Sequence, residues 1–270
     1  MSVITTKLIE QAMKACVLGG IEILKVYEST IDVSYKDDKS PLTEADKRAH
    51  NAIVAILEQN SIPILSEEGK HDAYADRKDW ELLWVVDPLD GTKEFIKRNG
   101  EFTVNIALVQ NGAPIMGVIF VPVQNQLYIG AEGVGAFRMA DIKTVEQVEN
   151  WEKVKAKADA IPEKQERAFT MVGSRSHMSD ETMAYFENIK KEHPNAEVIS
   201  KGSSLKICMV AEGSADVYPR FAPTMEWDTA AGHGIAKYAG FEVLHPEKGT
   251  PLEYNKEDLL NPWFIVQKAE

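Results

Sequence analysis

The first part of the chain alternates between helical and extended hydrophobic patterns. Apolar residues recur at helical spacing over residues 4–28, which predicts an amphipathic helix. Residues 31–36 instead alternate between apolar and polar, as in a short strand. A second helix is predicted over about 43–59, with Thr43 as its N-cap. The polar stretch 70–79 is expected to be a loop.

Strand patterns dominate the middle of the chain. The apolar runs 62–65 and 82–86 predict strands, and the second is continuous, as expected of a strand buried on both faces. Several more strands are expected within 101–137. The pair Asn111-Gly112 separates two of them, and Asn-Gly between apolar runs is a strong hairpin signal. We therefore predict a mostly antiparallel sheet here.

Strands and helices alternate after residue 168. Strands are expected at 169–172, 196–199, 215–218, 241–244 and 263–267, and helices at 179–192, 203–213 and 228–239. This order implies an α/β layer with crossover helices. The last helix is rich in alanine and glycine, which allows it to approach a neighbouring layer closely, and Trp227 before it is expected in the core.

The fold class is therefore α/β (α+β), in three parts. Residues 1–139 are expected to form an α+β part with the large sheet and most metal ligands. Residues 140–168 are highly charged and are interpreted as a surface excursion or a junction. Residues 169–270 are expected to form an α/β part.

The composition is that of an ordinary folded protein and restricts the possible partners. Apolar residues make up 44% and charged residues 27% of the 270, so a sizeable core can form without cross-links. The 42 acidic and 30 basic residues give a net charge of −12, which disfavours binding to a nucleic acid polymer or an anionic lipid surface. A small anionic substrate is compatible with this charge if metal ions reverse it locally.

Cysteine usage and the apolar runs favour a cytoplasmic location. Cys16 and Cys208 lie in apolar surroundings and are expected to be buried free thiols. The beginning of the chain lacks the basic start and continuous apolar core of a signal peptide, and no apolar run approaches the ~20 residues of a membrane helix. Loose attachment to the inner face of the membrane is the alternative. The sequence does not predict an oligomeric state.

Acidic residues stand where predicted elements begin or end. They are Asp46 in SPLTEAD, Glu67 in LSEEG, Asp87 and Asp90 in VVDPLDGT, and Asp228 in EWDTAAG. Taken singly, each has an ordinary structural explanation. Asp46 can accept N–H groups in the first turn of a helix, Glu67 can lie in an exposed turn, and Asp228 can be an N-cap.

The segment VVDPLDGT indicates more than a structural role. Pro88 ends the strand and Gly91 permits a tight turn, so that Asp87 and Asp90 can converge with the carbonyl of Leu89 between them. Converging carboxylates repel each other unless a cation lies between them. Oxygen ligands together with water suit Mg²⁺. The chemistry indicated is metal-assisted attack of water on a phosphoryl group.

Three motifs carry a resemblance to a known family. LSEEG, DPLDGTKEF and WDTAAGHGIA, in this order and at these spacings, resemble the signatures of the lithium-sensitive, magnesium-dependent phosphomonoesterases of the inositol monophosphatase superfamily. The resemblance extends from about residue 4 to 267 and is weakest over 140–167. It implies a layered α/β/α/β/α sandwich.

Further segments narrow the resemblance. SPLTEAD, VGSRSH, KGSSLKICMVAEGSADVYPRFAPTMEWDTAAGHGIA and LLNPWF are similar to the bacterial 3'(2'),5'-bisphosphate nucleotidases of this superfamily. This implies Mg²⁺-dependent removal of the 3'-phosphate of adenosine 3',5'-bisphosphate, giving AMP and phosphate. The sulfated analogue is a second expected substrate, and the expected role is clearance of a by-product of sulfur assimilation.

The resemblance also implies a metal site with two or three Mg²⁺ ions. The implied ligands are the side chains of Glu67, Asp87, Asp90 and Asp228 and the backbone carbonyl of Leu89. Asp87 would bridge two ions, of which one is shared with Glu67 and the other with Asp90 and Asp228. In such a site one ion activates water and the other stabilises the leaving oxygen.

The implied catalytic residues are Asp46, Thr92 and Glu67. Thr92 would donate to Asp46 and accept from the nucleophilic water, so that geometry rather than unusual acidity orients and deprotonates it. The backbone N–H groups of Gly91 and Thr92 begin the helix after the motif and would point at the scissile phosphate. An N-cap hydroxyl is the structural alternative for Thr92.

Four residues are implied in substrate binding. Ser203, Lys206 and Arg220 match the nucleotide pocket of the subfamily, where Lys206 and Arg220 would bind the second phosphate as a point charge and a fork. His177 would stack on the adenine or hydrogen-bond near it. Without the resemblance, Lys206 and Arg220 would be interpreted as ordinary ion pairs and His177 as a surface residue.

Three functions from two classes stay open at this point. The first is the nucleotide-specific phosphatase. The second is an inositol monophosphatase or sugar bisphosphatase of the same superfamily, which the metal motifs alone do not separate from the first. The third is a non-catalytic phosphonucleotide or metal sensor, against which the complete acidic set with Asp46 and Thr92 argues.

Overall fold

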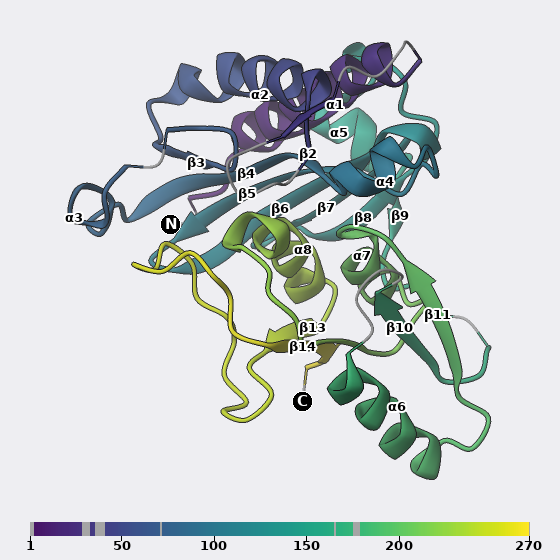
Figure 1. Cartoon of the computed structure of the whole chain (residues 1–270). Helices are drawn as coiled ribbons and strands as arrows, with labels where there is room; N and C mark the ends of the chain where they lie inside the picture. Colours follow the sequence, from purple (N-terminus) through teal and green to yellow (C-terminus); the bar gives the residue numbers. More distant parts are fainter. Residues whose placement is uncertain are drawn as a thin grey trace.

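A large mixed sheet forms the centre of the molecule. The computed structural model describes residues 3–28, 33–35, 41–70, 72–164, 166–174 and 179–269. Within these ranges the sheet has seven strands in the order β3-β4-β5-β6-β7-β8-β9 (Figure 1). They are β3 (Ile64–Ser66), β4 (Leu82–Asp90), β5 (Thr103–Gln110), β6 (Ala113–Val121), β7 (Gln126–Ala131), β8 (Gly135–Met139) and β9 (Asp159–Ala160). Only the β3–β4 pair among them is parallel.

The long strand β4 is buried on both faces, as its continuous apolar run predicts. Trp84 and Val86 belong to a core on one side of the sheet, whereas Leu83 and Val85 belong to a core on the other side. Because successive side chains of a strand point to opposite faces, an unbroken apolar run is what two covered faces require. The predicted hairpin is also confirmed: Asn111 and Gly112 connect β5 to β6.

Helices α1 (Thr6–Tyr27) and α2 (Glu44–Leu57) cover one face of the sheet (Figure 1). The Thr5 hydroxyl accepts the N–H of Leu8 and caps α1. The charged segment after β8 also contributes to this core: it forms η3 (Val145–Val148) and α5 (Trp151–Lys155), and Trp151 is only 3% exposed. The three-part division of the chain stays a prediction.

Helices α7 (Leu205–Ala211) and α8 (Glu226–Tyr238) lie against the opposite face of the sheet. The alanines and glycines of α8 allow the close approach that the sequence predicts. A Cβ atom added to Gly117 on β6 would lie 2.0 Å from the carbonyl oxygen of Ala231. Trp227 is buried in the same core, as expected.

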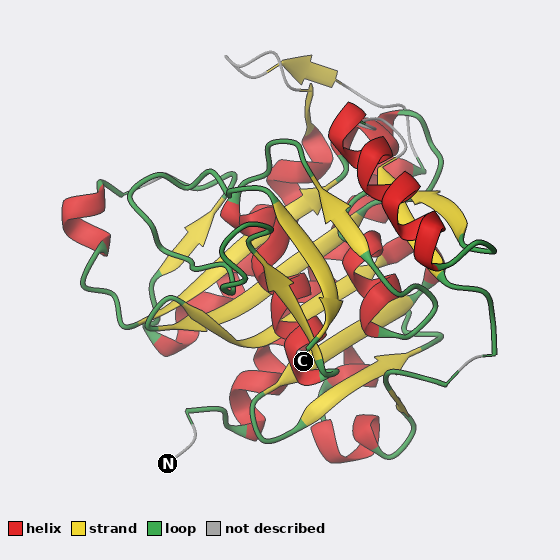
Figure 2. Ribbon diagram, turned by 90° about the horizontal axis from the view of Figure 1, so that it is seen from below, coloured by secondary structure: helices red, strands yellow, loops and turns green. Residues whose placement is uncertain are grey.

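A second layer of strands lies beyond α7 and α8. It contains the antiparallel strands β12 (Tyr218–Arg220), β14 (Phe264–Lys268) and β13 (Phe241–Leu244) and the parallel pair β10 (Thr170–Ser174) and β11 (Glu197–Lys201). Helix α6 (Asp180–Glu192) covers this layer through Phe186. The order is therefore α/β/α/β/α, as the resemblance implies. The end of β14 lies away from α1 and α2 (Figure 1), and Figure 2 views the molecule from that side.

Several predicted boundaries are corrected. The stretch 70–79 contains a short helix, α3 (Tyr74–Arg77), rather than only a loop. The predicted strand 215–218 forms a parallel bridge to β10 through Val217 and continues as β12, which pairs antiparallel with β14. The predicted second helix is α2 and ends in the 3₁₀ turn η1 (Glu58–Asn60). The strands β1 (Val33–Tyr35) and β2 (Pro41–Thr43) precede it, and Thr43 ends β2 directly before α2, so its role as N-cap stays a prediction. The remaining short elements are α4 (Thr92–Ile96) and η2 (Pro122–Gln124).

None of the helices in the described ranges has both the length and the apolar character needed to cross a bilayer.

The contact between β6 and α8 gives a test of the packing. We expect Gly117→Ala to destabilise the protein by about 3 kcal/mol, because the added methyl meets backbone atoms that cannot rotate away. Gly133→Ala is the control: no atom lies within 4 Å of its added Cβ, and its φ of 71° accounts for a loss of about 1 kcal/mol. Chemical denaturation measures both, and equal losses would contradict the close approach.

Candidate active site

A bulge at the end of β4 brings Asp87 and Asp90 together. Asp87 pairs with Asn105 and Asp90 pairs with Thr103, so three steps along β4 match two along β5. Pro88 lies inside this bulge, where the missing N–H of proline is tolerated. The backbone N–H of Leu89 donates to Oδ1 of Asp87 at 3.0 Å and fixes the turn.

The chain turns sharply after Asp90. Gly91 has a φ of 95°, in the left-handed region that favours glycine, and it immediately precedes α4. The hydroxyl of Thr92 donates to the carbonyl oxygen of Leu89 at 3.4 Å. Gly91 and Thr92 therefore begin the helix after the motif, as the sequence predicts.

Asp228 belongs to α8, which packs on the face of the large sheet opposite to α1 and α2. The structure excludes the N-cap alternative for this residue, because Met225 is the N-cap and Asp228 is the third residue of the helix. The Asp228 carboxylate reaches back, and its Oδ2 accepts the N–H of Met225 at 2.8 Å. This contact explains why α8 begins two residues earlier than predicted.

Asp87, Asp90 and Asp228 converge. One carboxylate oxygen from each lies within 4.8 Å of the others. Burial, reinforced by the charge of Glu67 and then of Asp90, raises the pKa of Asp87 well above its usual range. Burial and the charge of Asp90 raise the pKa of Asp228 to about 8. The close, buried carboxylates therefore disfavour one another's ionised form.

Glu67 and Asp46 lie beside this cluster. Glu67 follows β3, which runs parallel to β4, and its N–H donates to the carbonyl of Val86 at 3.1 Å. Asp46 lies in the first turn of α2 and is 2% exposed. The charges of both residues contribute to the raised pKa of Asp87, which indicates that they lie near it. Elements from both faces of the large sheet therefore supply acidic residues to one place.

The donor set fits a hard divalent cation. Each of the three converging carboxylates uses one oxygen to accept a backbone N–H, from Leu89, Ser204 or Met225. The second oxygen of each accepts no hydrogen bond from the residues that the structure describes. In each carboxylate the second oxygen can therefore bind a cation that prefers oxygen ligands.

A cavity of about 130 Å³ adjoins the acidic cluster. Asp90 and Asp228 of the acidic cluster line it. The other lining residues are Gly91, Lys93, Glu94, Lys201, Gly202, Ser203, Ser204, Lys206, Ile207, Tyr218, Arg220, Thr224, Thr229 and Phe264. The structure therefore brings Gly91, Ser203, Lys206 and Arg220 to one cavity.

Two cationic side chains line the same cavity as the carboxylates. The ammonium group of Lys206 is buried, donates to the carbonyl oxygen of Ser203 at 2.7 Å and lies 5.4 Å from the ring centre of Tyr218. Burial lowers the pKa of Lys206 to about 8, although the charge of Asp90 opposes this shift. Arg220 donates to the carbonyl oxygen of Pro223 at 3.2 Å, while its buried Nε has no partner among the described residues. The two residues provide donors for an anion.

Sequence reasoning missed part of this cavity. Lys93 and Lys201 add positive charge to its lining, and Ser204 touches Asp90. Lys201 is the first residue of the KGSSLK segment, and this position next to Ser203 is the signal that could have indicated it. His177 lies outside the described residues, so its predicted role stays a prediction.

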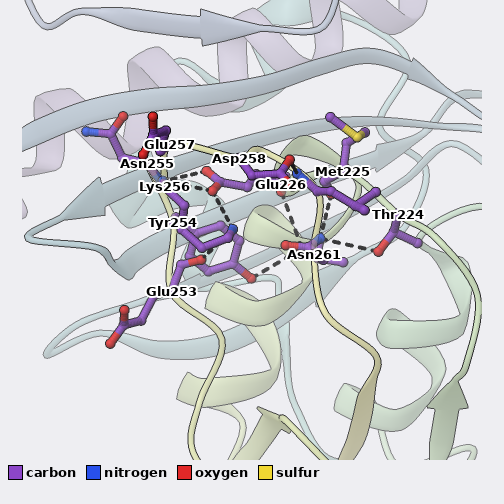
Figure 3. A network of polar contacts seen from close by, with 12 residues as sticks. Thr224, Met225, Glu226, Glu253, Tyr254, Asn255, Lys256, Glu257, Asp258 and Asn261 are labelled. Atoms are coloured by element: carbon purple, nitrogen blue, oxygen red, sulfur yellow. Dashed lines mark hydrogen bonds and ion pairs between the residues drawn. The ribbon is translucent and has the colours of Figure 1, made fainter. Parts of the chain in front are cut away.

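The segment 253–261, between β13 and β14, forms hydrogen bonds with the first residues of α8 (Figure 3). The fully buried carboxylate of Glu226 accepts the backbone N–H groups of Asn255 and Lys256 at 2.6 and 3.0 Å, and the Lys256 ammonium group at 2.5 Å. The amide of Asn261 contacts the carbonyl oxygen of Met225 at 2.7 Å. These contacts fix the helix turn that carries Asp228.

Carboxylates that converge at a strand end beside a cationic cavity, in an α/β/α/β/α sandwich, define a metal-dependent phosphatase. The chain belongs to the inositol monophosphatase family, whose model matches residues 5–268. Metal dependence is a property of this family, and the acidic cluster agrees with it.

Individual relatives agree with this assignment. The 3'(2'),5'-bisphosphate nucleotidase CysQ of Escherichia coli K12 is 44% identical over 264 residues, covering 96% of this chain and 99% of the relative. The crystal structure of CysQ from Bacteroides thetaiotaomicron, described as a bacterial member of the family, is 54% identical, covers 100% of both chains and superimposes with a TM-score of 0.93. SuhB from Bartonella henselae shares the fold at 22% identity, with a TM-score of 0.73 over 97% of this chain and 93% of that one.

The raised pKa values predict how stability depends on pH without divalent cations. The folded pKa of Asp228, about 8, exceeds its ordinary value of 3.8, so the folded state binds protons that the unfolded state releases. The free energy of unfolding should therefore fall as the pH rises from about 4 through about 8. Thermal melting in EDTA measures this.

Mg²⁺ provides the second arm of this test. It should raise the melting temperature more at about pH 8 than at about pH 6, because it interacts with the ionised carboxylates. The variant Asp228→Asn should show a flatter pH profile in EDTA. A profile that is equally steep in this variant would contradict the assignment to Asp228.

Proposed function

We propose that the chain is a 3'(2'),5'-bisphosphate nucleotidase that hydrolyses the 3'-phosphate of adenosine 3',5'-bisphosphate to give AMP and phosphate. One observation carries this: a single cavity is lined both by the carboxylates of Asp90 and Asp228 and by the cationic groups of Lys206 and Arg220. A substrate with two phosphates could use both, with metal ions at the carboxylates for one phosphate and the cationic groups for the other. The nucleotidases that match nearly the whole chain support the same activity.

The acidic cluster would hold Mg²⁺, in two or three ions. Asp87, Asp90, Asp228 and Glu67 would supply side-chain oxygens, and Leu89 would supply its backbone carbonyl. When bound, divalent cations polarise the phosphoryl oxygens and acidify water. Oxygen ligands alone favour Mg²⁺ over softer metals.

The chain's own groups would orient the nucleophile and the phosphate. Thr92 is the first residue of α4, and its hydroxyl donates to the carbonyl oxygen of Leu89. In the substrate complex it would accept a hydrogen bond from the attacking water, and Asp46 would take the proton. The N–H groups of Gly91 and Thr92 would donate to the scissile phosphate.

The second phosphate would bind between Lys206, Arg220 and Ser203. The Arg220 guanidinium offers a planar set of donors, of which the buried Nε lacks a partner within the described residues. Ser203 has a φ of 44° and lines the same cavity. His177 is proposed to contact the base, and the sulfated analogue is proposed as a second substrate. The cytoplasmic location and the role in sulfur metabolism belong to this proposal.

Inositol phosphates and sugar bisphosphates are the alternative substrates, because the acidic cluster serves a phosphoryl group common to all of them. A monophosphate would leave Lys206 and Arg220 without an anionic partner, which argues against it. A non-catalytic sensor would need neither Asp46 nor Thr92.

The proposed function predicts a substrate order. With Mg²⁺, kcat/KM should be highest for adenosine 3',5'-bisphosphate, at least about tenfold above inositol 1-phosphate and fructose 1,6-bisphosphate. Charge-assisted hydrogen bonds to the 5'-phosphate, each about 1.5–3 kcal/mol, account for the ratio over inositol 1-phosphate. The ratio over fructose 1,6-bisphosphate, which also has a second phosphate, would come from the proposed contact with the base. Phosphate release measures it. The control Asp87→Asn should abolish release from all three substrates while the protein stays folded, and a preference for the inositol or sugar substrate would overturn the proposal.

Arg220→Ala tests the second phosphate site. It should raise KM for adenosine 3',5'-bisphosphate by about 10–100-fold, the equivalent of about 1.5–3 kcal/mol. Adenosine 3'-monophosphate, which lacks the 5'-phosphate, serves as the matched substrate, and its KM should change little. Steady-state kinetics with both substrates decides this, and equal increases would exclude the role.

A further inference from the structure

Ser204 connects the elements that carry the acidic cluster. This residue directly precedes α7 and is 3% exposed. Its backbone N and its Oγ lie 2.5 and 2.6 Å from the same oxygen of Asp90, Oδ2. Its Oγ is also 3.0 Å from the carbonyl oxygen of Asp228. One serine therefore contacts both the end of β4 and the first turn of α8.

Two residues of β5 determine the direction of these hydrogen bonds. Thr103 and Asn105 lie opposite Asp90 and Asp87 in the sheet and are fully buried. The Thr103 hydroxyl donates to Oδ1 of Asn105 at 2.9 Å, which leaves the amide nitrogen pointing the other way. That nitrogen donates to Oγ of Ser204 at 2.8 Å. Since Oγ accepts this bond, its single proton is available for Asp90 Oδ2, the nearest acceptor.

The result is an oriented chain of donors from Thr103 through Asn105 and Ser204 to Asp90. Two donors hold Oδ2 of Asp90, and its Oδ1 accepts no hydrogen bond within the described part of the molecule. The carboxylate is thereby fixed in one orientation with one oxygen left for another partner. Buried chains of this kind restrain their end members more than an isolated contact does.

We propose that Ser204, oriented by Asn105 and Thr103, is a positioning residue that fixes the Asp90 carboxylate for binding a divalent cation. The proposal rests on the proposed function in one respect, that Asp90 is a metal ligand. Ser204 touches neither metal nor phosphate in this role. Hydrogen-bond partners of metal ligands commonly change metal affinity by about 10–100-fold when they are removed.

The test is Mg²⁺ binding to Ser204→Ala in the absence of nucleotide. Isothermal titration should give an affinity about 10–100-fold weaker than that of the unsubstituted chain. The melting temperature in EDTA should fall by only a few degrees, because the buried Asn105 amide loses its acceptor while the backbone N–H of residue 204 still donates to Asp90. High Mg²⁺ should restore most of kcat. The matched control is Ser214→Ala. Ser214 lies beyond the C-terminal end of α7, where its hydroxyl donates to the carbonyl oxygen of Met209 and contacts the Glu212 carboxylate. This substitution should leave Mg²⁺ affinity unchanged.

Asn105→Ala tests the orientation of the serine hydroxyl. Alone it should weaken Mg²⁺ binding, and in the Ser204→Ala background it should add little, because it acts through the serine. Unchanged Mg²⁺ affinity in Ser204→Ala, or additive losses in the double variant, would overturn the proposal. A chain that binds Mg²⁺ as expected but prefers another phosphomonoester would overturn only the proposed function. A chain without Mg²⁺ affinity would overturn both.

Discussion

Repulsion between the carboxylates of Asp87, Asp90 and Asp228 is the interaction on which the rest of the site depends. Burial and mutual charge raise the pKa of Asp87 and Asp228, so the folded chain holds these groups together against an electrostatic cost. A donor from the chain restrains each of them: the N–H of Leu89, Ser204 or the N–H of Met225. These hydrogen bonds keep the three carboxylates close together although their charges repel. A bound cation would remove this repulsion.

The distance between the two halves of the cluster depends on layer packing. Asp228 belongs to α8, and the backbone of α8 approaches the large sheet so closely that Gly117 and Gly130 have no room for a side chain. The buried Glu226 attaches the following loop to the same helix turn (Figure 3). Residues that take no part in phosphate chemistry therefore determine where Asp228 lies relative to β4.

Sequence patterns predicted the elements with strong periodicity and the acidic residues at their ends. The two-sided burial of β4 and the hairpin at Asn111-Gly112 follow from local signals that few other structures satisfy. The helix α8 was predicted to begin at Asp228 but begins at Glu226, because the sequence alone does not distinguish a carboxylate at the third helical position from one at the N-cap. Asn105 and Ser204 were missed for another reason: a polar residue in a strand is ordinary, and only three-dimensional contact reveals its partner. The roles of Lys206 and Arg220 were accessible only through the resemblance.

The bulge in β4 has a consequence for how the site tolerates change. In a regular strand, side chains three residues apart face opposite sides of the sheet, so Asp87 and Asp90 could not share a cation. The one extra residue in the bulge reverses this parity. Deleting either Pro88 or Leu89 would preserve every acidic residue but would abolish the bulge and disrupt the turn in which the N–H of Leu89 holds Asp87. The spacing of this motif is therefore as much a part of the site as its composition, and length variation belongs in loops elsewhere.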